Sequence, residues 1–120
     1  MRYRVAAVGV VLSLVLFATP TALVHAHASL DRITPANDSV VSGTVAVVEL
    51  QFDEDVTSPR ITVRRNESVV SGRITRIGGT VRFTPRTPMK KGTYSVVWRV
   101  RSADGHFISG ISRFKVTKSN

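Results

Sequence analysis

The sequence predicts an all-β domain, a Greek-key sandwich or small barrel of about seven short strands. Apolar and polar residues alternate with a period of two in several segments. Turn residues separate these segments at intervals of roughly eight to twelve residues, and we find no convincing helical period after residue 26. The length of 120 residues suits one domain, without internal repeats, linkers or low-complexity tracts.

The predicted strands follow one another along the chain. The first strong alternation spans residues 46–52, with the apolar positions Ala46, Val48, Leu50 and Phe52. Shorter segments follow around Ile61 and Val63, around Ile74 and Ile77, and around Val81 and Phe83. The clearest strand is residues 93–101, with Tyr94, Val96, Trp98 and Val100 on one face. A last strand, residues 111–116, directs Phe114 and Val116 inward. We expect residues 102–110 to connect these two strands at one end of the sheets, where functional side chains are often displayed.

The first 26 residues have the layout of a secretory signal peptide. Arg2 and Arg4 precede an apolar run at residues 5–18, Pro20 follows, and residues 24–26 are suited to cleavage after Ala26. A retained membrane anchor is the alternative, although a spanning helix needs about 20 strongly apolar residues. We therefore expect a single domain at residues 27–120 that begins with His27 and is periplasmic or extracellular.

Sulfur content and charge narrow the possible functions. The chain has no cysteine, and Met89 is the one methionine after the predicted cleavage site, so we expect no dedicated Cu(I) site. The net charge is +9. The arginines at alternating strand positions form either a solvated outer face or a surface for anionic lipid head groups or an acidic partner. They are Arg60, Arg64, Arg65, Arg73, Arg76, Arg82 and Arg86. Nucleic acid is not expected as a partner of an exported protein whose aromatic residues belong to the core.

The histidines indicate a metal site. His25 would leave with the signal peptide, whereas a terminal His27 offers its α-amine and its imidazole Nδ1 to one metal. His106 follows Asp104 at a spacing of two, and side chains two residues apart in an extended chain point the same way. Three nitrogens and one carboxylate oxygen favour Cu(II), which ranks above Zn(II) for such donors. The alternative is a simple Asp-Gly hairpin turn that binds nothing.

Seven segments after residue 26 carry a family resemblance: His27-Ala28-Ser29-Leu30, Thr34-Pro35-Ala36, Phe52-Asp53-Glu54, residues 92–100, residues 102–106, Gly110 and Phe114-Lys115-Val116. Through these segments the chain resembles the CopC family of bacterial copper-resistance proteins over essentially its whole length after residue 26. The resemblance implies an immunoglobulin-like β-sandwich that binds one Cu(II) ion. It also implies that His27 and His106 are ligands, that Asp104 is a ligand or near-ligand, and that Glu54 lies close to the metal. Some family members hold Cu(I) in a Met-rich loop, and residues 56–89 contain nothing similar.

The same resemblance implies a role in copper sequestration or in delivery to an inner-membrane copper transporter of the CopD type. Contact with the membrane is then expected only through that partner, and no enzymatic activity is expected. An N-terminal histidine clamp on a β-sandwich also occurs in copper polysaccharide oxygenases, but residues 27–120 leave little room for an extended substrate surface. A third possibility is a metal-free basic interaction module. The Asp53-Glu54-Asp55 run is either a solvated turn or a negative patch that attracts the cation.

Overall fold

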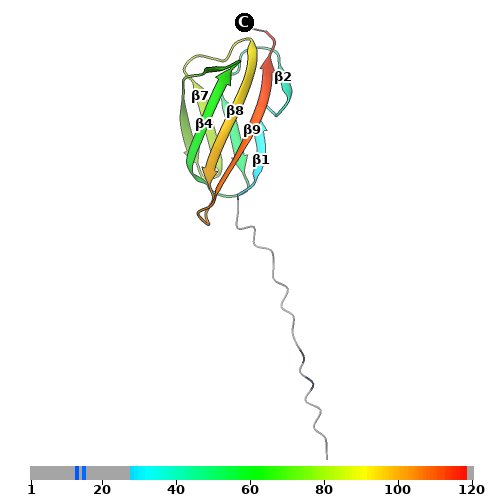
Figure 1. Ribbon diagram of the computed structural model, residues 1–120, viewed down its shortest axis with the longest axis vertical. Coiled ribbons are helices and arrows are strands. Elements are labelled where there is room, and N and C mark those ends of the chain that lie inside the picture. The colour runs from blue at the N-terminus through cyan, green and yellow to red at the C-terminus, as the bar shows by residue number, and fades with distance from the viewer. Residues whose placement is uncertain (1–12, 14, 16–27, 119–120) are drawn as a thin grey trace, which may run out of the picture.

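The computed structural model describes residues 13, 15 and 28–118, and this part of the chain contains nine strands and no helix (Figure 1). His27 and the predicted signal peptide, apart from the two isolated positions, lie outside the described residues. In the part of the chain that is described, no helix is long and apolar enough to cross a membrane. Two sheets pack face to face, which confirms the predicted all-β sandwich.

The two sheets contain four and five strands. The four-stranded sheet has the order β1-β3-β7-β6, formed by β1 (Leu30–Thr34), β3 (Val48–Phe52), β7 (Thr80–Pro85) and β6 (Gly72–Ile77). The five-stranded sheet has the order β2-β9-β8-β4-β5, formed by β2 (Ser39–Val41), β9 (Phe107–Val116), β8 (Gly92–Arg101), β4 (Thr57–Arg65) and β5 (Ser68–Val69). Within each sheet neighbouring strands are antiparallel, except that β2 runs parallel to β9.

The inner faces of both sheets form one hydrophobic core. As the alternation predicts, β8 buries one face and exposes the other, and the buried side chains are Tyr94, Val96, Trp98 and Val100. The four-stranded sheet contributes Val48, Leu50, Phe52, Val81 and Phe83, and β4, beside β8, contributes Ile61 and Val63. The Trp98 ring meets the Phe52 ring edge-on with centroids 5.4 Å apart, and this contact joins the two sheets. The core is therefore the one that the sequence pattern predicts.

Three details of the sequence prediction are wrong. Residues 28–118 form nine strands and not about seven, because short edge strands such as β2 and β5 have no clear alternation. Ala46 is exposed and precedes β3, which begins at Val48. Residues 107–110 belong to β9 and not to the connecting loop, since β8 and β9 pair from Gly92↔Val116 to Arg101↔Phe107.

The inverted composition of β9 explains why its first half was missed. Its outward positions include the exposed Phe107 and Ile111, while its inward positions include Gly110 and the buried Ser112 beside the partly buried Ile108. A Cβ atom at Gly110 would lie 2.5 Å from the Trp98 ring, so a larger residue does not fit at that inward position. An alternation rule that expects apolar residues inside therefore fails in this segment.

Strand register brings three connections to the same end of the sandwich. Leu30 at the start of β1 pairs with Phe52 at the end of β3, and Thr57 at the start of β4 pairs with Arg101 at the end of β8. The segment before β1, the β3–β4 turn and the β8–β9 loop therefore lie at one end (Figure 1). Chain segments far apart in the sequence meet here, and this end holds Glu54, Asp104 and His106.

Candidate metal centre

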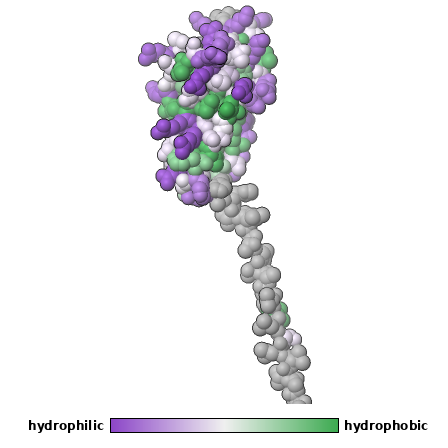
Figure 2. Space-filling view, in the orientation of Figure 1, coloured by the Kyte–Doolittle hydropathy of each residue, from purple (hydrophilic) through white to green (hydrophobic). Residues whose placement is uncertain are grey.

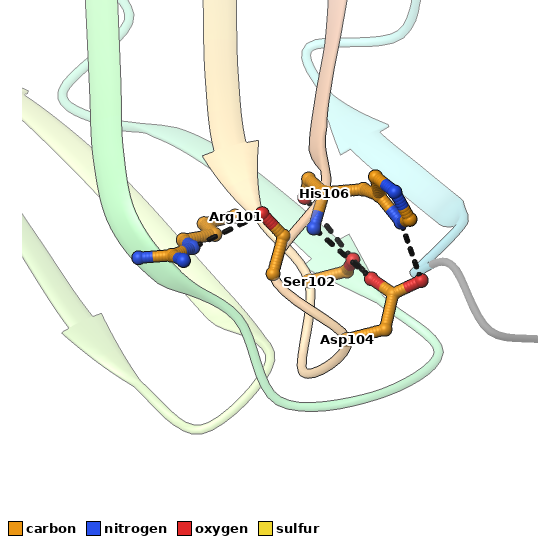
Figure 3. Close-up of polar contacts among 5 residues, drawn as sticks. Arg101, Ser102, Asp104 and His106 are labelled. Atoms are coloured by element: carbon orange, nitrogen blue, oxygen red, sulfur yellow. Dashed lines mark hydrogen bonds and ion pairs between the residues drawn. The ribbon is translucent and has the colours of Figure 1, made fainter.

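The β8–β9 loop, residues 102–106, is a tight connection closed by its own backbone. The Ser102 amide donates to the His106 carbonyl at 2.8 Å, and the Gly105 amide donates to the Ser102 carbonyl at 3.0 Å. Gly105 has φ 88°, a left-handed conformation that glycine adopts at little cost. Arg101 Nε donates to the Gly105 carbonyl at 3.1 Å and fixes the loop to the end of β8 (Figure 3). The loop is therefore held in one shape.

Within this loop, Asp104 and His106 contact each other directly. His106 Nδ1 lies 2.8 Å from Asp104 Oδ2, so the predicted spacing of two does bring the side chains together. The other carboxylate oxygen accepts hydrogen bonds from the Ser102 hydroxyl and, at 3.1 Å, from the His106 amide. Figure 3 shows the carboxylate between the Ser102 hydroxyl and the His106 ring. The pair is thus oriented by hydrogen bonds within the loop.

These hydrogen bonds keep Asp104 ionised. The Ser102 hydroxyl, and after it the His106 side chain, hold the pKa of the Asp104 carboxyl well below its usual range. The Asp104 side chain is 23% exposed and that of His106 is 69% exposed, so the imidazole is open to an incoming ion. A carboxylate that contacts one imidazole nitrogen commonly fixes the ring so that the other nitrogen binds a metal.

The β3–β4 turn at the same end holds the acidic run, and its residues differ in role. Asp53 Oδ1 accepts from the Ser29 amide at 2.7 Å, and the Asp53 amide donates to the Ser29 carbonyl at 3.0 Å. Ala28, directly before Ser29, is only 4% exposed. Asp53 therefore anchors the segment before β1. No signal in the sequence could have shown this role, because the bond joins residues far apart in the chain.

Glu54, the other acidic residue predicted for the site, does not join the Asp104–His106 pair. Among the residues that the structure describes, no group of three or more His, Asp or Glu side chains is close enough to hold a metal ion. Glu54 Oε1 is nevertheless buried, and it has no hydrogen-bond partner among the described residues. Since buried carboxylate oxygens are nearly always hydrogen-bonded, this atom is unusual. The structure thus brings Asp104 and His106 into contact, places Glu54 at the same end of the sandwich but in no group of three possible ligands with them, and does not describe His27.

Comparison of this chain with known proteins identifies its family. A family model described as the CopC domain matches residues 30–117. The chain belongs to the CopC family. The chain is also 32% identical over 108 residues to Copper resistance protein C of Pseudomonas syringae pv. tomato, a match that covers 80% of this chain and 85% of that protein. The sequence-based resemblance is therefore confirmed.

Solved CopC-type structures share the fold. Crystal structures of PcoC, a methionine-rich copper resistance protein from Escherichia coli, and of CopC from Methylosinus trichosporium OB3b superpose with TM-scores of 0.69 and 0.70. The first is 26% identical and covers 77% of this chain and all of PcoC. The second is 23% identical and covers 76% of this chain and 94% of the other. In contrast to the methionine-rich PcoC, this CopC chain has two methionines, and Met89 is a core residue that is 3% exposed.

Proposed function

We propose that this CopC-family protein holds one Cu(II) ion outside the cytoplasmic membrane, between an N-terminal His27 and the Asp104–His106 pair. The observation that carries the proposal is the 2.8 Å contact between Asp104 and His106 in a loop braced by Ser102. This braced pair lies at the end of the sandwich where the segment leading into β1 is anchored. The chain would sequester copper or deliver it to a membrane transporter of the CopD type.

The anchored segment before β1 gives His27 a defined starting point. His27 is bonded to Ala28, which is buried, and Ser29 is fastened to Asp53 by two hydrogen bonds. Consecutive Cα atoms are about 3.8 Å apart, so a ligand at position 27 would be one residue away from this anchored backbone. Cleavage after Ala26 would create a free amine beside the His27 imidazole at this point. Preorganised donors lose less entropy on binding, which favours tight capture of the ion.

The donor set suits Cu(II). Imidazole and amine nitrogens completed by an oxygen ligand form the tetragonal N,O environment that this ion prefers. The contact of Asp104 with His106 Nδ1 supports metal binding through His106 Nε2, with Asp104 orienting the ring from the side away from the metal. Glu54 would lie next to the site, where its buried oxygen could accept a hydrogen bond from a copper-bound water or from the amine.

Copper titration of defined N-termini tests the proposal. Protein that starts at His27 should bind one Cu(II) tightly. The same protein with one glycine ahead of His27, and the variant His106→Ala, should each bind more than about 100-fold more weakly, because each loses a direct ligand. Glu67→Gln, at the exposed turn between β4 and β5, removes one carboxylate and should bind as the wild type does.

The same samples separate the alternatives. If the glycine extension and His106→Ala both bind copper as tightly as the unmodified protein, the proposed site is wrong. A copper oxygenase would consume oxygen in the presence of ascorbate and polysaccharide, whereas a copper carrier would not. A metal-free basic module would show no rise in melting temperature with Cu(II). Ion binding at about 100 times the dissociation constant should instead add roughly 2.7 kcal/mol of stability.

A further inference from the structure

The outer face of the five-stranded sheet displays cations without acidic partners. Because Ile61, Trp98 and Phe114 point into the core, the alternate positions of β4, β8 and β9 point outward. The exposed cations at these positions, here called the basic face, are Arg60, Arg64, Arg99, Arg101, Arg113 and Lys115. The strands of this sheet contain no Asp or Glu. Within residues 28–118, no ion pair involves the basic face.

Strand register places these cations close to one another. Arg60 on β4 lies directly opposite Arg99 on β8, and Arg64 and Arg113 flank Ser95 in a single row. Like charges opposite each other in a sheet destabilise the fold. On the other sheet, by contrast, Glu49 lies opposite Arg82 and pairs with it at 2.6 Å. The basic face therefore retains a repulsion that an anionic ligand would relieve.

Apolar side chains are interspersed among the cations. Val97 lies opposite Ile111, and these two side chains and Phe107 are 38%, 56% and 50% exposed. The Arg99 guanidinium lies 3.8 Å from the centroid of the Phe107 ring, a cation–π contact. Figure 2, which views the molecule from the side of β4, β8 and β9, shows hydrophobic patches between hydrophilic groups on this face. The surface combines phosphate-binding cations with side chains able to enter a lipid interface.

We propose that the basic face docks onto an anionic lipid surface and contacts the phosphates of phosphatidylglycerol-type head groups. All but one of its cations are arginines. One planar guanidinium group can donate two parallel hydrogen bonds to two oxygens of the same phosphate. An acidic protein is a less suitable partner, because the cores of protein interfaces are depleted of charge and this face has cations on either side of its apolar row. At a lipid surface the cations stay hydrated at the level of the head groups, while Phe107 and Ile111 enter the interface.

Docking of the basic face would bring the β8–β9 loop to the membrane surface. Arg101 on the basic face donates to the Gly105 carbonyl, and Phe107 directly follows His106. The β8–β9 loop is thus continuous with the basic face, so copper held there would lie at the edge of the docked surface. This proposal replaces the expectation that the protein meets the membrane only through a partner. It does not depend on copper binding.

Vesicle sedimentation with a charge-matched pair of variants tests the proposal. The protein starting at His27 should bind vesicles of mixed phosphatidylcholine and phosphatidylglycerol, should not bind phosphatidylcholine alone, and should bind less as salt rises. The triple variant Arg60→Gln, Arg99→Gln, Arg113→Gln should bind on the order of 100-fold more weakly, or roughly fivefold for each cation removed. The control triple Arg32→Gln, Arg73→Gln, Arg86→Gln makes the same change in net charge outside the five-stranded sheet and should lose far less.

Two outcomes of these experiments would overturn the lipid-docking proposal. Equal losses in the two triples would mean that net charge alone drives binding. Binding to soluble polyglutamate but not to the anionic vesicles would assign the face to an acidic protein partner. Thermal melts check the fold, and removal of the Arg60–Arg99 repulsion should leave the melting temperature unchanged or higher. His106→Ala should keep its vesicle binding, so failure of the lipid proposal and failure of the copper proposal are distinguishable.

Discussion

The β8–β9 loop and the β3–β4 turn lie at the same end of the sandwich and both present carboxylates, yet the carboxylates are hydrogen-bonded in different ways. In the loop, Asp104 accepts from the Ser102 hydroxyl and the His106 amide, and its second oxygen contacts the His106 ring. In the turn, Asp53 is hydrogen-bonded to the Ser29 backbone, while Glu54 Oε1 is buried without a partner. In the loop, both carboxylate oxygens of Asp104 have partners within the loop itself. In the turn, Glu54 Oε1 has no partner among the described residues.

This difference assigns different tasks to the two connections. The loop orients the proposed metal-binding pair through its own hydrogen bonds, so an incoming ion would not have to order them. The turn fastens the segment before β1 and contains a buried Glu54 oxygen that has no partner among the described residues. Of these two connections, the braced loop should therefore contribute more to the copper affinity, and Glu54 should adjust it.

The largest expected effect within this comparison is that of Asp104→Asn. The amide keeps the shape of the carboxylate but loses the charge that orients the His106 imidazole, so Cu(II) affinity should fall roughly 10- to 100-fold. Competition titration against a copper chelator measures the change. Asp31→Asn is the matched control, because Asp31 is an exposed carboxylate on β1. An equal loss in Asp31→Asn would show that overall charge and not the braced loop sets the affinity.

A smaller effect is expected for Glu54→Gln in the turn. Copper affinity should fall by less than about tenfold, below the usual range for a group that contacts a ligand directly. The metal-free protein should melt at a slightly higher temperature, because an amide costs less to bury than a carboxyl group whose oxygen has no partner among the described residues. Asp55→Asn, at an exposed neighbouring position, should change neither quantity. If Asp55→Asn matches Glu54→Gln in both measurements, the buried oxygen has no special role.

Local patterns in the sequence predicted the core and one half of the site, and nonlocal contacts determined the rest. Period-two alternation was sufficient for the inner face of β8, and the spacing of Asp104 and His106 was sufficient for their contact. The bond between Asp53 and Ser29 could not be predicted, because it depends on how β1 pairs with β3. The start of β9 was missed because Gly110 fits against Trp98 where the pattern expects an apolar residue.

The smallest expected effect concerns acid stability. Hydrogen bonds from Ser102 and His106 lower the pKa of Asp104 in the folded protein. A lowered folded-state pKa adds stability above the unfolded value of about 3.9, and that stability disappears as the pH falls toward the folded pKa. With copper removed, wild type should therefore melt slightly above Asp104→Asn from about pH 7 to 5, with the difference shrinking below about pH 4.

Glu49 provides the internal comparison for this measurement. Arg82 and then Gln51 lower its pKa on the four-stranded sheet, so Glu49→Gln should show the same narrowing in acid without any effect on copper affinity. A gap between wild type and Asp104→Asn that widens in acid would mean that the loop stabilises the protonated carboxyl. The loop would then favour a neutral Asp104 and would not present a negative charge to a cation. The proposed difference in role between this loop and the β3–β4 turn would be wrong.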